Sequence, residues 1–596
     1  LIYAPGLYGG FVYDDWSSIT GNANVHIVDG SWAEWIKAGI SFPSGTPPFR
    51  SLTMVSFAAN HFVGGPDPFG FKLANLSIHV LNGLLLFLAL RALFQLSALV
   101  ANQHPGTRPA FDPSVAAAAL AGLWLLLPIN LTAVLYVVQR LESLATLFIF
   151  LGLWWYLRSR LRHWRGEGGT PGLFLSLGLC TALSILCKEV GVMLPFYAFL
   201  VEFCLTGGRN RDGRRSVPVT VLYVLTLLLP LIVGMIWLWG RYIGPGTAGT
   251  STYGLLRLMT EARVIVDYIV WTLLPSLDSL TLYHDDIVMS EGLLSPPSTL
   301  ASILALAALL GAALWQRHRR PLFALGVLWF FAGHLLTGTV IPLILAFEHR
   351  NYFSSAGLLL GVAGLFVLEG GLQRIQGRLV VIGIASLLFS GTLWMRAQEW
   401  SDPLRLAHSE AAKRPQSPSA QYDYAQALII LGQRTAQSAP ISAALKVLDE
   451  ARKLPGSSTH FEQSMIGILA PSGIAVPADL WNSLIRKLRA HAPDTNAIHS
   501  LSRLNHCFMD KKCNSTDLPY LAEAYEAALS RPISNVGLLG VHGEYAWHVL
   551  GDRDIAEQDY REALRRHPRD IEAQMNLIVV LIHQGKLVLD APMEEI

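Results

Sequence analysis

Up to about residue 395 the chain is a succession of apolar runs, most of them long enough to cross a lipid bilayer. A helical span needs about 20 apolar residues, and lipid offers no partner to an unpaired backbone group. The candidate spans are 1–9 (incomplete), 71–94, 114–131, 142–157, 172–187, 190–205, 217–239, 298–315, 321–345, 353–371 and 379–395. These runs predict an all-α, polytopic membrane bundle of about 11 spans.

Composition changes along the chain. Only 15% of the residues are charged, against about 25% in soluble domains. From 396 onward the sequence becomes polar, charged and rich in alanine. We therefore predict a membrane domain over 1–395 and a soluble domain over 396–596. The net charge of +2 gives no reason to expect a nucleic-acid partner.

The charges of the connecting loops predict an orientation. The segments 158–169, 207–216, 317–320 and 373–378 are basic, and they fall on one side if each span crosses once. Loops with this excess of Lys and Arg stay in the cytoplasm. The apolar piece 263–277 is interpreted as an interfacial or re-entrant helix, because a full span there would misplace 317–320. The soluble domain is then outside, in the periplasm if the protein lies in a bacterial inner membrane.

Polar side chains interrupt or border the apolar runs on the predicted outer side. Ionisable groups at membrane depth are costly and mark functional sites, although each singly can also end a span. Together they predict a membrane-level cavity. Its candidate residues are Asp14 and Asp15, Arg50, His79, Arg140, Lys188 and Glu189, His284, Asp285 and Asp286, and Glu348, His349 and Arg350.

Such a cavity suits transfer from a lipid-linked phosphate donor. Arg and Lys can hold a phosphate leaving group and stabilise its developing charge. A carboxylate beside the attacking hydroxyl can act as general base. The segment "SLTMVSFAANHF" (51–62) predicts an amphipathic helix that lies flat on the membrane near the acids.

Several short motifs, in order, resemble a known family. They are "YDDW", "FRSLTMVSFAANHFVGGPDPFGFKLANLSIHVLN", "VVQRLESLATLF", "CKEVGVMLPFYAFLVEF" and "EHRNYFSSAG", followed by a helical-repeat tail. This order is similar to bacterial relatives of protein O-mannosyltransferases. It is most similar to the transmembrane-plus-tetratricopeptide branch of the glycosyltransferase C (GT-C) superfamily.

The resemblance implies a polyprenyl-phosphate-sugar donor, an inverting transfer and a protein hydroxyl acceptor. It places the catalytic acids at Asp14 and Asp15 and a donor phosphate ligand at Arg350. We predict Lys188 and Arg140 as helpers at the same phosphate. Of the two acids we favour Asp15 as base, because it is nearer the turn into "WSSITGN". His349 is inserted relative to the commoner family pattern and receives no role.

Metal and cysteine chemistry follow from the same topology. His284, Asp285 and Asp286 contain ligands suited to a divalent cation, but we favour a capped loop and predict neither a metal nor another cofactor. Three cysteines within apolar runs (Cys180, Cys187 and Cys204) are predicted to be small buried side chains. Cys507 and Cys513 are predicted to form a disulfide, because the orientation places them outside.

The tail carries a repeat signature. Ala556, Tyr560, Ala563 and Pro568 have the spacing of the second helix of a tetratricopeptide repeat (TPR). A weaker copy contains Ala444, Leu448 and Ala451. These patterns predict a TPR-like α-solenoid that binds a protein segment, although the 455–500 stretch breaks the period. The alternative is an ordinary amphipathic helical hairpin.

Taken together, these features predict a membrane glycosyltransferase that moves a sugar from a polyprenyl phosphate, such as undecaprenyl phosphate, to a Ser/Thr hydroxyl of an exported protein. A pilin is one candidate acceptor. One alternative is an oligosaccharide ligase or polymerase, or a transferase that modifies a glycan or lipid, using a lipid-linked donor. Another is a non-catalytic assembly scaffold, which would not need acids and cations gathered at one membrane level.

Overall fold

The structure is a computed structural model that describes residues 1–43, 50–101, 112–239, 248–339, 341, 343–368, 375–531 and 535–587. The chain forms two compact units, Leu1–Arg414 and Pro415–Ile596, and each is described separately. The boundary lies after the change in composition near 395. The first unit extends further because the Glu410 carboxylate accepts the N–H of Leu282, and Arg414 contacts His284.

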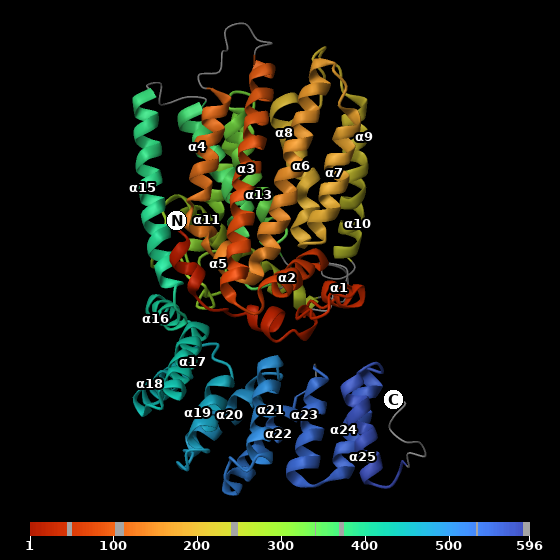
Figure 1. Cartoon of the computed structure of the whole chain (residues 1–596), viewed down its shortest axis with the longest axis vertical. Coiled ribbons are helices and arrows are strands. Elements are labelled where there is room, and N and C mark those ends of the chain that lie inside the picture. Colours follow the sequence, from red (N-terminus) through yellow and green to blue (C-terminus); the bar gives the residue numbers. More distant parts are fainter. Residues whose placement is uncertain are drawn as a thin grey trace. The chain divides into compact units, whose positions relative to one another are not determined.

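The first unit is a bundle of helices (Figure 1). Its α-helices are α1 (Trp32–Gly39), α2 (Ser51–Gly64), α3 (Pro68–Ala101), α4 (Pro113–Leu125), α5 (Thr132–Leu135), α6 (Arg140–Arg165), α7 (Thr170–Ile185), α8 (Leu194–Val201), α9 (Val217–Tyr223), α10 (Leu229–Leu238), α11 (Ala248–Leu273), α12 (Ser298–Gln316), α13 (Pro321–His334), α14 (Asn351–Ala363), α15 (Ile375–Glu399) and α16 (Pro403–Lys413). The described residues form no named β-strand, so the all-α prediction is confirmed.

Fewer helices reach membrane-spanning length than the sequence predicted. Within the described ranges seven helices are long and apolar enough, or eight if α4 and the helices after it form one span with a 61° bend. Two predicted spans are shorter apolar helices, α7 and α13, of 16 and 14 residues. Helix α11 carries Arg257, Glu261, Arg263 and Asp267 and is not among the candidate spans.

Residues 1–9 are not the end of an α-helical span, contrary to the prediction. Ala4–Tyr8 form a short 3-10 helix, η1, with a proline in its first turn. Gly6 packs so closely on Leu135 that a Cβ atom there would overlap the Leu135 side chain. The Gly6 carbonyl also accepts a hydrogen bond of 3.1 Å from Lys72 Nζ. This segment is therefore fitted against the bundle by proline, glycine and a buried lysine.

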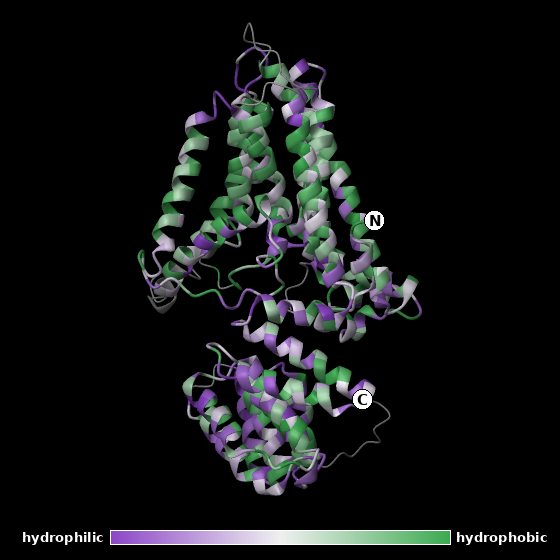
Figure 2. Ribbon diagram, turned by 90° about the vertical axis from the view of Figure 1, so that its left-hand side faces the viewer, coloured by the Kyte–Doolittle hydropathy of each residue, from purple (hydrophilic) through white to green (hydrophobic). Residues whose placement is uncertain are grey.

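The two ends of the bundle differ. Helices α1 and α2 lie across one end, and the loop between α6 and α7 lies at the other (Figure 1). Hydrophilic residues concentrate towards both ends, whereas the middle of the bundle is mostly hydrophobic (Figure 2). Of the predicted basic loop 373–378, residues 373 and 374 lie outside the described residues. We call the end that carries α1 and α2 the α2 end.

The second unit is a row of short helices. They are α17 (Pro418–Thr435), α18 (Ser438–Ala451), α19 (His460–Leu469), α20 (Ala478–Ala490), α21 (Thr495–Met509), α22 (Leu518–Leu529), α23 (Gly537–Tyr545), α24 (Arg553–Arg566) and α25 (Ile571–His583). Helices α19, α20 and α21 each pack on the helix two positions along, as in a solenoid. The irregular 455–500 stretch thus still contributes helices to the row.

The predicted repeat residues form the packing face of α24. Ala556, Tyr560 and Ala563 are buried. Tyr560 lies against Gly543 of α23, where an added Cβ atom would come within 2.8 Å of the ring. The small residue therefore lets the tyrosine fill the space between the two helices.

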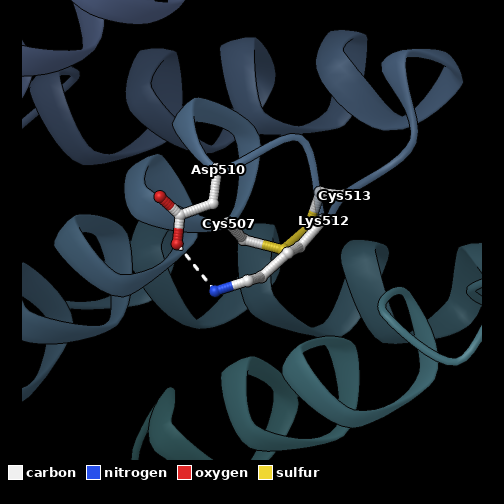
Figure 3. The surroundings of a disulfide bond; sticks show 4 residues. All are labelled: Cys507, Asp510, Lys512 and Cys513. Atoms are coloured by element: carbon white, nitrogen blue, oxygen red, sulfur yellow. Dashed lines mark hydrogen bonds and ion pairs between the residues drawn. A yellow bond between two sulfur atoms is a disulfide. The ribbon is translucent and has the colours of Figure 1, made fainter.

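A disulfide joins Cys507, near the end of α21, to Cys513 in the loop that follows (Figure 3). Between them, Lys512 pairs with Asp510 at 2.8 Å on the exposed side of the loop. The bond closes the turn between α21 and the next helix. Cys180, Cys187 and Cys204 are free and buried in the first unit.

Helices α13 and α14 approach each other through glycines. A Cβ atom at Gly326 would overlap the backbone of Gly361 and lie 2.6 Å from the carbonyl oxygen of Gly357. Small residues allow such approach in membrane bundles, where packing contacts replace the hydrophobic effect. This contact fixes α14, and with it the residues just before α14 at the α2 end.

We predict that Gly326→Leu lowers the melting temperature of the purified protein markedly. Overpacking costs about 1–3 kcal/mol in ordinary cores, and here the new side chain meets backbone that cannot move aside. Gly311→Leu on α12 is the matched control, because nothing lies within 4 Å of its added Cβ atom. Equal melting temperatures for the two variants in detergent would contradict the proposed close packing.

Candidate functional site

The acid pair lies in the first loop of the chain, just before the short π-helix η2 (Trp16–Thr20). The two carboxylates have different surroundings. Asp15 is completely buried, whereas Asp14 is exposed to solvent. One of the adjacent acids is thus buried and the other accessible, a difference that the sequence alone did not reveal.

Asp15 docks this loop on the bundle. One carboxylate oxygen accepts the backbone N–H of Val12 at 3.0 Å, and the other accepts that of Val138 at 2.7 Å. Burial raises the pKa of Asp15 to about 7, while these N–H groups and the charge of Lys72 lower it. Because both carboxylate oxygens accept backbone N–H groups, Asp15 stabilises the position of the first loop on the bundle. The geometry does not support our preference for Asp15 as base.

Asp14 remains accessible beside a buried tyrosine. Its backbone N–H donates to the Tyr136 hydroxyl at 3.1 Å, and Tyr136 is fully buried. Desolvation raises the pKa of Asp14 above its usual value, while a hydrogen bond from the Tyr136 hydroxyl to the carboxylate and the charge of Arg50 lower it. An accessible carboxylate with this support is able to accept a proton.

Aromatic rings surround the acid pair. The Tyr13 ring contacts Tyr136, with centroids 6.4 Å apart, and Tyr283, at 5.7 Å. Tyr136 also meets the edge of His349 at 6.5 Å, and His349 stacks on Phe347 at 4.9 Å. The rings connect the first loop with the segments before α12 and α14. The buried His349 ring is thus part of the wall of the site.

Two of the predicted cations are held by carboxylates. Arg50 forms a two-pronged contact with Glu189, with nitrogen–oxygen distances of 3.0 and 3.2 Å. Lys188 pairs with Glu142 at 2.7 Å and is largely buried. The first pair ties the start of α2 to the segment before α8, and the second ties that segment to α6. A donor phosphate would have to compete with Glu142 for Lys188.

Arg350 is the predicted phosphate ligand whose charge remains least engaged. Its guanidinium donates to the carbonyl of Leu345 at 2.9 Å and lies over the ring of Phe347. Within the described ranges no carboxylate oxygen comes within the 4.0 Å ion-pair limit of Arg350. The charges of Lys188 and Arg350 both act on His349. Arg350 is therefore a partly exposed cation beside the aromatic wall.

Arg140 does not join the site, contrary to the prediction. It is buried, and its guanidinium donates to the Asn75 and Asn60 side chains at 2.6 and 2.7 Å. Further bonds go to the carbonyls of Ser56 and Phe71. Because these partners occupy its donors, Arg140 fastens α2 to α3 and is not available to a phosphate.

His79 and Glu348 also have structural positions. His79 is inside the bundle, where its ring nitrogens contact the Tyr352 hydroxyl at 2.8 Å and the Leu125 carbonyl at 3.2 Å. Glu348 is buried against Arg396 of α15 at 3.0 Å. Both predictions of an open cavity position are therefore wrong. A polar residue inside or beside a predicted span was too weak a signal.

The segment 284–286 is bound by an arginine. Arg414 contacts the His284 ring at 3.0 Å and Asp286 at 3.4 Å, and His284 stacks on Trp271. Burial and the positive charge of Arg414 lower the pKa of His284 to about 3. Within the described ranges, no three or more His, Cys, Asp or Glu side chains gather in a way suited to a metal ion. Asp285 neighbours this cluster.

Sequence reasoning missed the residues that hold the site together. Tyr136 stands among apolar neighbours and Tyr283 ends an apolar stretch just before His284, and both look like packing residues in the sequence. Arg396 and Arg414 lie at or beyond the end of the last predicted span, far in sequence from Glu348 and His284. A lone hydroxyl in an apolar run was the only signal for Tyr136, and it carries no information about its partner.

Parts of the chain are similar to animal proteins named protein O-mannosyl-transferases. Tmtc2 of Drosophila melanogaster is 30% identical over 236 residues, which are 37% of this chain and 22% of that protein. TMTC3 and TMTC2 of Homo sapiens are 26% and 29% identical over 253 and 252 residues, 39% and 40% of this chain.

These matches cover 24% and 27% of the two human proteins, so the similarity spans about a quarter of each relative's length. No family model and no solved structure matches the chain. The similarity supports the resemblance to protein O-mannosyltransferases drawn from the motifs.

We predict that Tyr136→Phe moves the acidic limb of the pH–activity profile to higher pH. The hydroxyl lowers the pKa of Asp14, so its removal lets that pKa rise. A general base is active only when ionised, and activity is then lost at a higher pH as the solution is acidified. Tyr283→Phe is the control, and an unshifted Tyr136→Phe profile would contradict the positioning role.

Proposed function

We propose that the protein is a membrane glycosyltransferase that moves a sugar from a polyprenyl-phosphate donor to a Ser/Thr hydroxyl of an exported protein. The observation that carries the proposal is the exposed Asp14 carboxylate at the α2 end of an apolar bundle that also bears Arg350. The relatives are named protein O-mannosyl-transferases, so mannose is the first sugar to test.

In the proposed reaction the acceptor oxygen attacks the anomeric carbon of the sugar. The bond between that carbon and the phosphate oxygen breaks, and polyprenyl phosphate leaves with the electron pair. The hydroxyl proton passes to Asp14, which acts as general base. Arg350 stabilises the negative charge that develops on the leaving phosphate. Attack opposite the leaving group inverts the anomeric carbon, as the GT-C resemblance implies.

Apolar helices with little protein cover favour a lipid-linked donor. Only 11% of the most apolar stretch of Val217–Ile236 is buried inside the protein, and the same fraction holds for Gln376–Glu399. In a bilayer these faces contact acyl chains, and a polyprenyl tail has the same chemistry. Its phosphate head would then reach Arg350 from the membrane, while the acceptor reaches Asp14 from water.

The loop charges support a location in a bacterial inner membrane with the second unit in the periplasm. Under the positive-inside rule the basic loops remain in the cytoplasm and the α2 end faces outward. The disulfide between Cys507 and Cys513 agrees with this orientation, because disulfides persist in oxidising compartments.

We predict that Asp14→Asn lowers sugar transfer by about 10²–10⁴-fold, because asparagine keeps the size of the side chain but cannot accept the proton. The assay uses the full chain in lipid nanodiscs, labelled polyprenyl-phosphate mannose and a Ser/Thr peptide. Donor binding should survive, since the leaving phosphate is held elsewhere.

Asp29→Asn is the matched control, because Asp29 is an exposed acid of the same loop region. Asp15→Asn should instead lower thermal stability, since an amide oxygen cannot replace both carboxylate acceptors. If Asp14→Asn retained normal transfer while Asp15→Asn of confirmed fold lost it, the base would be Asp15.

We predict that Arg350→Ala raises the KM for the donor and lowers kcat/KM by roughly 10- to 100-fold, the range expected for one hydrogen bond to a charged group. Arg350→Lys should recover only part of the loss, because an ammonium lacks the planar fork of a guanidinium. Arg405→Ala, at an exposed arginine near the start of α16, is the control. Unchanged kinetics in Arg350→Ala would show that another residue binds the donor phosphate. Activity only with diphosphate-linked donors would show that the donor is of that class instead.

A further inference from the structure

We infer that the second unit binds an acidic segment of the acceptor protein in a groove along α20; the identity of the partner as the acceptor rests on the proposed function. Two cavities, of about 760 and 490 Å³, lie beside this helix. Both are lined by Arg486 and Ala490. Because they share these residues, the two cavities adjoin along α20, and together we call them the α20 groove.

Cations dominate the charged lining of the α20 groove. Five basic side chains line it, against two carboxylates. The basic residues are Arg452, Lys453, Arg486, Lys487 and Arg489, and the acids are Asp494 and Glu523. The Asp494 carboxylate is also engaged, since it caps α21 by accepting the N–H of Ala497. The groove therefore favours a ligand with several negative charges.

Neighbouring acids fix some of these cations in place. Arg452 contacts Asp449 and Asp479, each at 2.8 Å. Lys487 pairs with Glu462 at 2.9 Å, and Arg489 pairs with Glu523 at 3.2 Å. These pairs orient the side chains before a ligand arrives, but they also neutralise part of the charge.

Arg486 differs from the others. It is exposed, and no carboxylate in the described part of the chain comes within ion-pair distance of it. Its position between the two cavities places this unneutralised charge at the centre of the groove. Lys453 also lines the groove; its side chain is 60% exposed and pairs with the partly exposed Asp449 at 2.7 Å. These two cations are the ones most available to a ligand.

The floor of the groove suits a hydrophilic, extended peptide. Ser457, Ser458, Thr459 and Ser483 contribute hydroxyls. The Ser457 hydroxyl and the Ser458 carbonyl also receive the Lys487 ammonium, at 2.9 and 3.1 Å. A single phosphate needs a compact cluster of free cations, whereas here the charges are spread along α20 and across to the end of α18. Carboxylates spaced along a peptide match that spread.

Binding of this kind depends on ionic strength. Exposed pairs contribute little individually, and charge complementarity mainly steers encounter and selects partners. At 0.1 M salt, charges separated by more than about 10 Å are screened. We therefore expect weak affinity that strengthens at low salt, and a preference for acceptor sequences with Asp or Glu near the modified Ser or Thr.

The test measures binding of a fluorescein-labelled Asp/Glu-rich Ser/Thr peptide to the full chain in nanodiscs of neutral lipid. The variant Lys453→Glu/Arg486→Glu reverses the two available charges, and its affinity should fall by about tenfold or more at low salt. Arg434→Glu/Arg569→Glu is the control, with the same charge change at exposed residues outside the groove. A lysine-rich peptide of equal length should not bind the wild type.

Equal affinity of the wild type and the groove variant overturns the inference. Equal loss in both variants also overturns it, because net charge would then explain the binding. Binding of anionic vesicles in place of the acidic peptide overturns it as well, in favour of a lipid surface. Transfer to a neutral acceptor peptide, measured separately, should be unchanged in the groove variant. If the wild type transferred no sugar to the neutral peptide, that result would count against the proposed function. The peptide-binding measurement would still decide whether the groove binds an acidic segment.

Discussion

The carboxylate of Asp15 is buried between two backbone segments, and its hydrogen bonds to Val12 and Val138 hold the first loop on the bundle. Hydrogen bonds to charged groups contribute about 1.5–3 kcal/mol each, which offsets part of the desolvation cost. The loop then places Asp14 on the Tyr136 hydroxyl. The position of the exposed acid thus depends on its buried neighbour.

Ion pairs determine which cations are available to a substrate. Glu189 engages Arg50, Glu142 engages Lys188 and Glu348 engages Arg396. Breaking a buried pair such as Arg396–Glu348 by removing one partner costs about 3–5 kcal/mol. The partly exposed Arg50–Glu189 pair contributes only about 1 kcal/mol or less, but it still occupies the Arg50 guanidinium. Among the described residues, Arg350 contacts the Leu345 carbonyl, the Phe347 ring and the Tyr268 hydroxyl, and it forms no ion pair. The difference makes it the best placed of the predicted cations to meet an anionic donor.

The two units are stabilised by different interactions. In the first, α13 and α14 meet through glycines, and polar groups deep in the bundle are joined in networks such as that of His79 and Tyr352. In the second, amphipathic helices bury alanine and tyrosine faces against neighbours, as α24 does with Tyr560. Membrane helices need close packing because lipid supplies no hydrophobic drive, whereas water drives the second unit to bury its apolar faces.

The sequence by itself determined the all-α class, the membrane character of the first part and the helical tail, because apolar length and helical spacing are local properties. It also identified Asp14, Asp15 and Arg350 as candidates. It did not separate Asp14 from Asp15, and it wrongly placed Arg140, His79 and Glu348 in an open cavity. Only the tertiary structure decided these points. Burial and hydrogen-bond partners come from segments distant in sequence, and no spacing within one segment records them.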